Sequence, residues 1–79
     1  MKSLCMINVK AGTVDNVLQV LKKKRSVSKD IMVVTGRADV CLILDGEINE
    51  INKFVTNLKK ITDVVSTETL IEVEVDMGW

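Results

Sequence analysis

The residues best suited to bind a small ligand lie in the segment 34–39, which reads Val-Thr-Gly-Arg-Ala-Asp. A turn at Gly36 would expose backbone N–H groups, and Arg37 and Asp39 add a guanidinium and a carboxylate beside it. These groups complement a zwitterion, because they offer both charges at one place. The structural alternative is a hairpin in which Gly36 supplies a positive φ and Asp39 bonds to local backbone. Composition alone favours that alternative.

Thr67 and Thr69 form a second candidate pair. They are two positions apart in a segment of alternating polarity, so both side chains point to one face of a strand and could supply hydroxyls. Thr is also a good strand former, and the spacing leaves both interpretations open.

Residues for catalysis or for holding a cofactor are missing from the pattern. The chain has no His and no Tyr, and its glycines form neither a dinucleotide fingerprint nor a phosphate-binding loop. Cys5 and Cys41 lie far apart without a C-x-x-C motif, which favours buried small side chains over a redox or metal site. We therefore expect no enzyme, no metal and no cofactor.

Charge and aromatic content argue against nucleic acid as the main partner. Eleven Lys and Arg balance eleven Asp and Glu, so no net positive field attracts phosphates. Phe54 and Trp79 are the only aromatic residues, which leaves almost no surface for stacking bases. A basic run at 22–25 is explained by the end of a helix, where the macrodipole favours cations, and a nucleic-acid role for it is the lesser alternative.

The hydrophobic pattern predicts six elements in the order strand, helix, strand, strand, helix, strand. We expect strands at 3–9, 31–34, 40–44 and 64–75, the last being the longest, with a tight hairpin between the second and the third. A first helix, capped by Thr13, runs to about Arg25, and a second ends near Lys60. No pattern extends over 76–79, where Trp79 either folds back or covers a partner.

The two halves repeat. A shift of 34 residues places Gly12 on Gly46 and Val17 on Ile51, which indicates a doubled strand-helix-strand unit. The prediction is one domain over 1–79 of the α+β, ferredoxin-like βαββαβ class, with a four-stranded antiparallel sheet in the order 4-1-3-2 and two helices on one face. The apolar run at 40–44 is too short to span a bilayer, and we expect a cytoplasmic, unexported protein.

The first and third strands are apolar at both odd and even positions, so both faces of the sheet require burial. Two helices cover one face only. Leaving six to eight aliphatic side chains in water costs about 1.5–3 kcal/mol each, which a domain of this size does not tolerate. We therefore predict a dimer that pairs the uncovered sheet faces, a dimeric α+β barrel.

Three segments carry a resemblance to a known family. They are the first strand and its turn (6–12), the segment 33–40 with its G-x-x-D turn, and the segment 65–71. Together they make nearly the whole chain resemble the effector-sensing (RAM) domain of the Lrp/AsnC transcription regulators. In that family the domain is ferredoxin-like, dimerises through its sheet, usually forms rings and binds small amino acids between dimers.

The resemblance implies that Gly36, Arg37, Ala38 and Asp39 lie at a ligand pocket, with Asp39 facing the ligand ammonium group. Thr67 and Thr69 would face the same pocket and hold the carboxylate. Many relatives carry an aromatic residue where this chain has Ala38. The family's helix-turn-helix does not occur in this sequence, which implies a stand-alone domain without direct DNA binding.

Two functions follow as hypotheses. The first is a stand-alone amino-acid-binding module that forms a homodimer and ring-like higher oligomers, and that co-assembles with a full-length Lrp/AsnC regulator. The alternative is a structural assembly module without a ligand, which Ala38 favours. An acylphosphatase or a dimeric barrel oxygenase ranks below both, because the residues for those reactions are missing.

Overall fold

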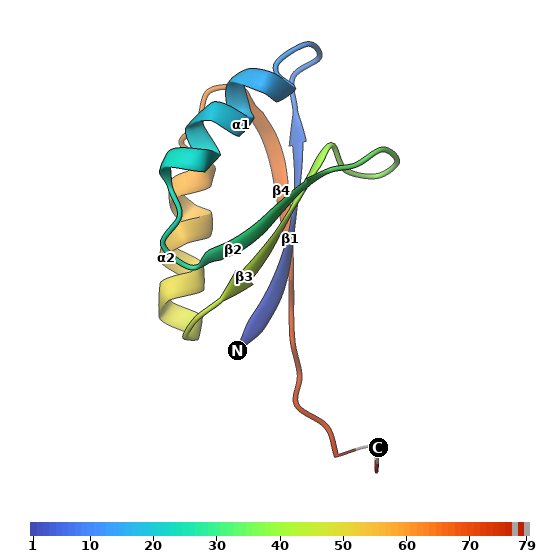
Figure 1. Cartoon of the computed structure of the whole chain (residues 1–79), viewed down its shortest axis with the longest axis vertical. Helices are drawn as coiled ribbons and strands as arrows, with labels where there is room; N and C mark the ends of the chain where they lie inside the picture. Colours follow the sequence, from blue (N-terminus) through green and yellow to red (C-terminus); the bar gives the residue numbers. More distant parts are fainter. Residues whose placement is uncertain (77, 79) are drawn as a thin grey trace.

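A computed structural model describes residues 1–76 and 78 of the chain, so the alternatives for Trp79 lie outside the described residues. Six elements follow one another in the predicted order (Figure 1). They are β1 (Lys2–Val9), α1 (Val14–Lys23), β2 (Ser28–Val33), β3 (Val40–Asp45), α2 (Ile48–Leu58) and β4 (Val64–Ile71).

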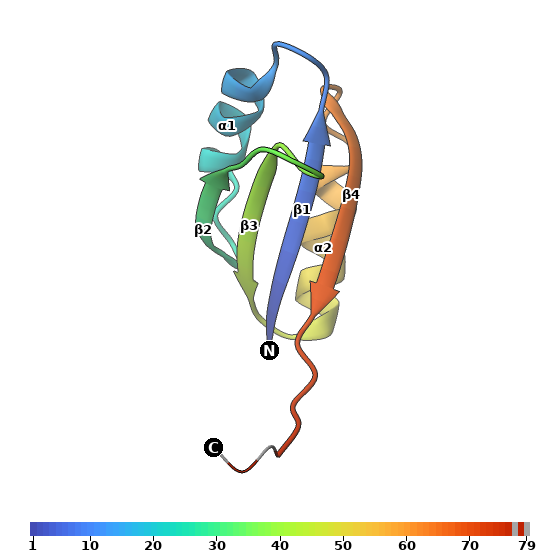
Figure 2. The same ribbon diagram turned by 90° about the vertical axis from the view of Figure 1, so that its right-hand side faces the viewer.

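The four strands form one antiparallel sheet in the order β2-β3-β1-β4, which is the predicted order 4-1-3-2 read from the other edge. Both helices lie on the same side of this sheet, and within residues 1–76 and 78 the opposite side carries no helix (Figures 1 and 2). The ferredoxin-like prediction is therefore confirmed. β1 and β3, the two apolar strands, are the inner pair.

The core lies between the sheet and the helices. Every second residue of β1 and β3 points into this core, and the apolar stripes of α1 and α2 pack against these residues. The fully buried side chains from the sheet are Cys5, Ile7, Val40, Leu42 and Leu44, and those from the helices are Val17, Leu21, Ile51 and Leu58.

The prediction for the fourth strand is wrong at its end. β4 stops at Ile71 and is eight residues long, the same length as β1, although the sequence alternates as far as Val75. β4 is an edge strand, and its one neighbour, β1, begins at Lys2. Lys2 and Glu72 exchange the last hydrogen bonds of this edge, through Glu72 N–H to the Lys2 carbonyl and Lys2 N–H to Glu72 Oε1. Residues 73–75 therefore have no strand beside them.

Smaller corrections concern the ends of other elements. α1 ends at Lys23 and not at Arg25, and Thr13 does not cap it, because its hydroxyl donates to the Lys10 carbonyl at 2.6 Å instead. α2 ends at Leu58, two residues earlier than expected. β2 starts at Ser28, three residues before the expected strand. Its register with β3 shifts between Ser28 and Asp30.

The connection between β2 and β3 is the six-residue loop 34–39, so the expected tight hairpin is not formed. This loop projects from the helix-free side of the sheet (Figures 1 and 2). Over residues 1–76 and 78, neither helix has the length and apolarity needed to cross a membrane.

Candidate functional site

One hydrogen bond closes loop 34–39, and two more hold it against the end of β1. The Val34 N–H donates to the Asp39 carbonyl at 2.9 Å, which closes the loop, and the Asp39 N–H donates to the Ile7 carbonyl at 3.0 Å. The Asp39 side chain then accepts the Val9 N–H at Oδ2, at 2.9 Å. The expectation that Asp39 bonds to local backbone is thus wrong, because its partner is 30 residues earlier on a neighbouring strand.

The other three predicted loop residues differ in exposure. Gly36 has φ +118°, so the positive φ expected there is confirmed, and open space surrounds the position of a Cβ. The Ala38 side chain is buried, whereas the Arg37 side chain is exposed. Arg37 Nη2 lies 3.9 Å from Glu68 Oε1 on β4, so the loop reaches across β1 to the far edge of the sheet. Such an exposed pair adds about 0–1 kcal/mol.

The structure does not bring Thr67 and Thr69 to this loop within one chain. Thr67 pairs with Ile7 and Thr69 with Cys5, and residues opposite each other in an antiparallel pair share a face. Both threonines therefore point to the helix side, together with the core, while loop 34–39 lies on the other side. The sequence predicted correctly that they share a face, but it did not say which one.

Thr69 has a buried hydroxyl that makes no well-formed hydrogen bond and lies beside the Cys5 thiol. Burial raises the pKa of this thiol, and the neighbouring hydroxyl opposes the rise only in part. Cys5 is thus a protonated core side chain. Cys41 lies on the opposite face of the sheet, since it pairs with Met6 rather than with a core residue, so the two cysteines are separated by the sheet.

The helix-free face of the sheet carries six apolar side chains, which we call the open face: Leu4, Met6, Met32, Cys41, Ile43 and Leu70. Registers place Leu4 between Ile43 and Leu70, and Cys41 between Met6 and Met32, so the side chains form two adjacent rows across the strands. Leu70 is 52% exposed. A shallow hollow of about 320 Å³ lies over the first of these rows.

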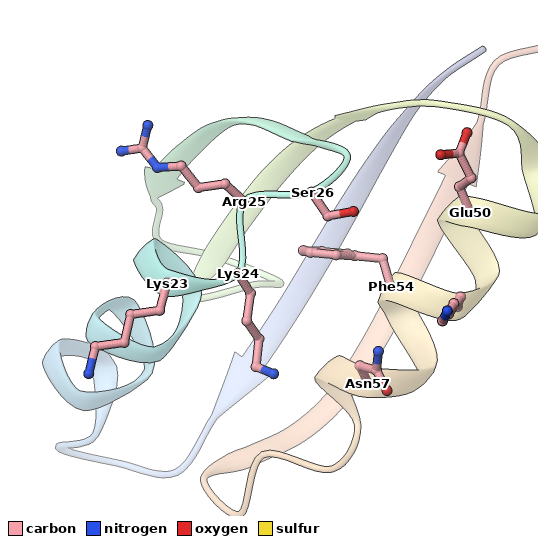
Figure 3. A pocket seen from close by; sticks show the side chains of 8 residues that line it. Lys23, Lys24, Arg25, Ser26, Glu50, Phe54 and Asn57 are labelled. Carbon is pink, nitrogen blue, oxygen red and sulfur yellow. The ribbon is translucent and has the colours of Figure 1, made fainter.

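A separate hollow of about 450 Å³, the basic groove, lies on the helix side between the end of α1 and the flank of α2 (Figure 3). Lys23, Lys24 and Arg25 border it from one side and Lys53 and Phe54 from the other. The sequence singled out the run 22–25 but not Lys53, because the pairing of the two helices decides which side chain of α2 faces that run. Over the described residues, no three Cys, Asp or Glu side chains group as metal ligands.

No family model matches the chain, and no curated protein matches it by sequence. Solved structures share its fold. FFRP-DM1 is 20% identical with a TM-score of 0.82, and the match covers 91% of this chain and 97% of that one.

Two further similar structures are about twice as long as the matched part. AsnC of E. coli is 20% identical with a TM-score of 0.72, over 94% of this chain and 51% of that one. The complex of the transcriptional regulator NMB0573 with L-Met, from Neisseria meningitidis, is 14% identical with a TM-score of 0.76, over 92% and 49%. The chain thus spans about half of each of these two proteins and has the fold that they contain.

Proposed function

We propose that this protein is an amino-acid-binding, oligomerising regulatory module of the Lrp/AsnC type and not an enzyme. It acts in the cytoplasm by assembling with itself and with transcription regulators that contain the same fold. It forms a homodimer through the open face, and dimers join into larger rings. Amino acids bind where copies meet.

The open face is the observation that carries this proposal. Its six apolar side chains lie in two continuous rows on a sheet that no helix covers on that side. Covering such a patch is favourable by about 25 cal/mol per Å² of apolar surface, and uncovered patches of this kind promote association. A second copy offers a matching surface under a two-fold axis.

Similar structures support the regulatory part of the proposal. One of these similar proteins is a transcriptional regulator in complex with L-Met, and another is AsnC. Each contains the present fold within a longer chain. The present domain can join such a regulator through the same sheet surface, which would change the assembly of that regulator.

Loop 34–39 is the proposed ligand contact of each copy. The turn at Gly36 has a positive φ and backbone N–H groups that can donate to a ligand. The exposed Arg37 side chain can turn from its 3.9 Å contact with Glu68 toward a carboxylate, and Asp39 has a second carboxylate oxygen besides the one that accepts the Val9 N–H. Ala38, between Arg37 and Asp39, is buried. Thr67 could complete the site only from a neighbouring copy, and the Thr69 hydroxyl would have to leave its buried position.

A thermal-shift panel of the twenty amino acids tests the ligand. At least one should raise the melting temperature, because a ligand that binds the folded state stabilises it by mass action. Asp39→Asn is the sharpest variant, since the Asn carbonyl can still accept the Val9 N–H while the charge that attracts an ammonium group is lost. The stabilisation should disappear in this variant with the fold intact. A flat panel for the unchanged protein would refute amino-acid binding.

The alternative function is a structural assembly module without a ligand. The engagement of Asp39 by the backbone of β1 favours it, because this carboxylate has a structural role that needs no ligand. Intact oligomers together with a flat thermal-shift panel would select this alternative.

A further inference from the structure

We propose that the basic groove binds a small anion that carries several phosphate groups. The residues that line the groove belong to the helix side of the molecule, whereas the open face and loop 34–39 lie on the opposite side of the sheet (Figures 1 and 3). A dimer built on the open face therefore leaves the groove accessible. The proposal does not depend on the amino-acid site.

Charge is the first argument. Four cations, from Lys23, Lys24, Arg25 and Lys53, border the groove, and one carboxylate, Glu50, accompanies them. Glu50 Oε1 is already engaged, because it accepts the Glu47 N–H at 3.0 Å in the capping box of α2. Within residues 1–76 and 78, the ion pairs are Met1 with Asp45 and Arg37 with Glu68, so none of the four cations is paired there.

The helix macrodipole explains only part of this cluster. Lys22 and Lys23 lie in the last turn of α1, where cations offset the partial negative charge of the free carbonyl groups. Lys24 and Arg25 follow the helix, and Lys53 lies in the middle of α2. The folded chain thus brings like charges together from two elements without a structural reason for Lys53, which favours a ligand that neutralises them.

The shape of the groove fits a compact ligand. Its volume of about 450 Å³ lies within the range of roughly 300–1,000 Å³ that is usual for small-molecule sites. Lys24 extends into the space between α1 and α2, and Ser26 points its hydroxyl to the α2 side of the groove (Figure 3). The heads of Lys23 and Arg25 point outward in this view. Both side chains are exposed, so a rotation about their own bonds would bring them onto an anion.

The same features favour a small phosphate compound over a nucleic acid. The four cationic residues border one hollow instead of forming a stripe along the surface. Phe54 is only 7% exposed and offers no platform for a base, and the whole chain has no net charge to attract a polyanionic strand. Ser26 and Asn57 add a hydroxyl and an amide that can donate to phosphate oxygens.

Calorimetric titration with phosphate, pyrophosphate and tripolyphosphate, at one low ionic strength, tests the proposal. Affinity should rise with the charge of the anion and fall as salt is added. Lys24→Glu and Lys53→Glu should each weaken tripolyphosphate binding about tenfold or more, since each replaces an attraction by a repulsion. Lys10→Glu is the matched control, because it makes the same charge change in the turn before α1, at the other end of that helix, and should leave the affinity unchanged.

Several results would overturn the proposal. Equal weakening by Lys10→Glu would show a diffuse charge effect, and absence of binding for all three phosphates would exclude the site. Binding of a DNA duplex without binding of tripolyphosphate would also refute it, in favour of a nucleic-acid surface. The amino-acid panel and the molar mass, measured on the same variants, should not change, so failure here is distinguishable from failure of the proposed function.

Discussion

Asp39 shows how one side chain can fix a whole loop. Its carboxylate accepts the Val9 N–H at 2.9 Å, its backbone N–H donates to the Ile7 carbonyl, and its carbonyl accepts the Val34 N–H that closes the loop. We predict that Asp39→Ala lowers the free energy of unfolding by about 1–3 kcal/mol, because a charge-assisted bond is lost and a partly buried N–H is left without a partner. Asp39→Asn should recover most of this loss. Chemical denaturation measures both, and an equal loss in the two variants would contradict this account.

The raised pKa of Cys5 leads us to predict that the free energy of unfolding falls at alkaline pH. Burial raises its pKa in the folded chain, whereas an unfolded thiol titrates near pH 8.5. Above that pH the unfolded chain has released a proton that the folded chain still holds, so stability should fall as pH rises, by up to about 1.4 kcal/mol per pH unit. Below that pH the thiol is protonated in both states, so its stabilising contribution to the folded state is fully present. When the free energy of unfolding is measured by denaturation at several pH values, Cys5→Ala should lose this decrease with pH and Cys41→Ala should keep it. The same decrease in both variants would show that Cys5 does not cause it.

At the scale of elements, the turn from β3 to α2 depends on a close approach at Gly46. A Cβ added there would lie 2.8 Å from Val27 Cγ1, although the backbone of Gly46 itself needs no positive φ. We predict that Gly46→Ala destabilises the fold by about 1–3 kcal/mol through overpacking. In a Val27→Ala background the same change should cost less, and a double-mutant cycle measures this coupling. Additive losses would show that the contact does not matter.

The elements were predictable where the sequence pattern alone decides them. The stripes of α1 and α2 and the apolar strands β1 and β3 follow from periodicity, and their order gives the sheet. The end of β4 does not, because the alternation continues to Val75 while β1 offers no partner beyond Lys2. Likewise, the shared face of Thr67 and Thr69 follows from their spacing, but only pairing with Cys5 and Ile7 shows that it is the helix side.

At the scale of the whole molecule, the open face decides whether the chain works alone. Burying its side chains is worth about 1.5–3 kcal/mol for each one that becomes fully covered, which is comparable to the net stability of a domain this small. The same side chains contribute little to the core of one subunit, because they point away from both helices. The fold of a subunit and its pairing can therefore be separated by substitution.

We predict that Leu70→Lys converts a dimer into a folded monomer. Leu70 is 52% exposed in the single subunit, so the change costs the subunit little, but in a dimer it would bury an unpaired charge. The mass measured by light scattering should fall from at least twice the chain mass of 8.8 kDa toward that of the single chain, while the circular dichroism spectrum stays that of a folded protein. Ile48→Lys is the control, because Ile48 is 39% exposed at the start of α2, on the helix side of the sheet. The dimer should persist in this variant. An unchanged protein that is already a folded monomer at micromolar concentration would show instead that water covers the open face, and the proposed regulatory assembly would lose its physical basis.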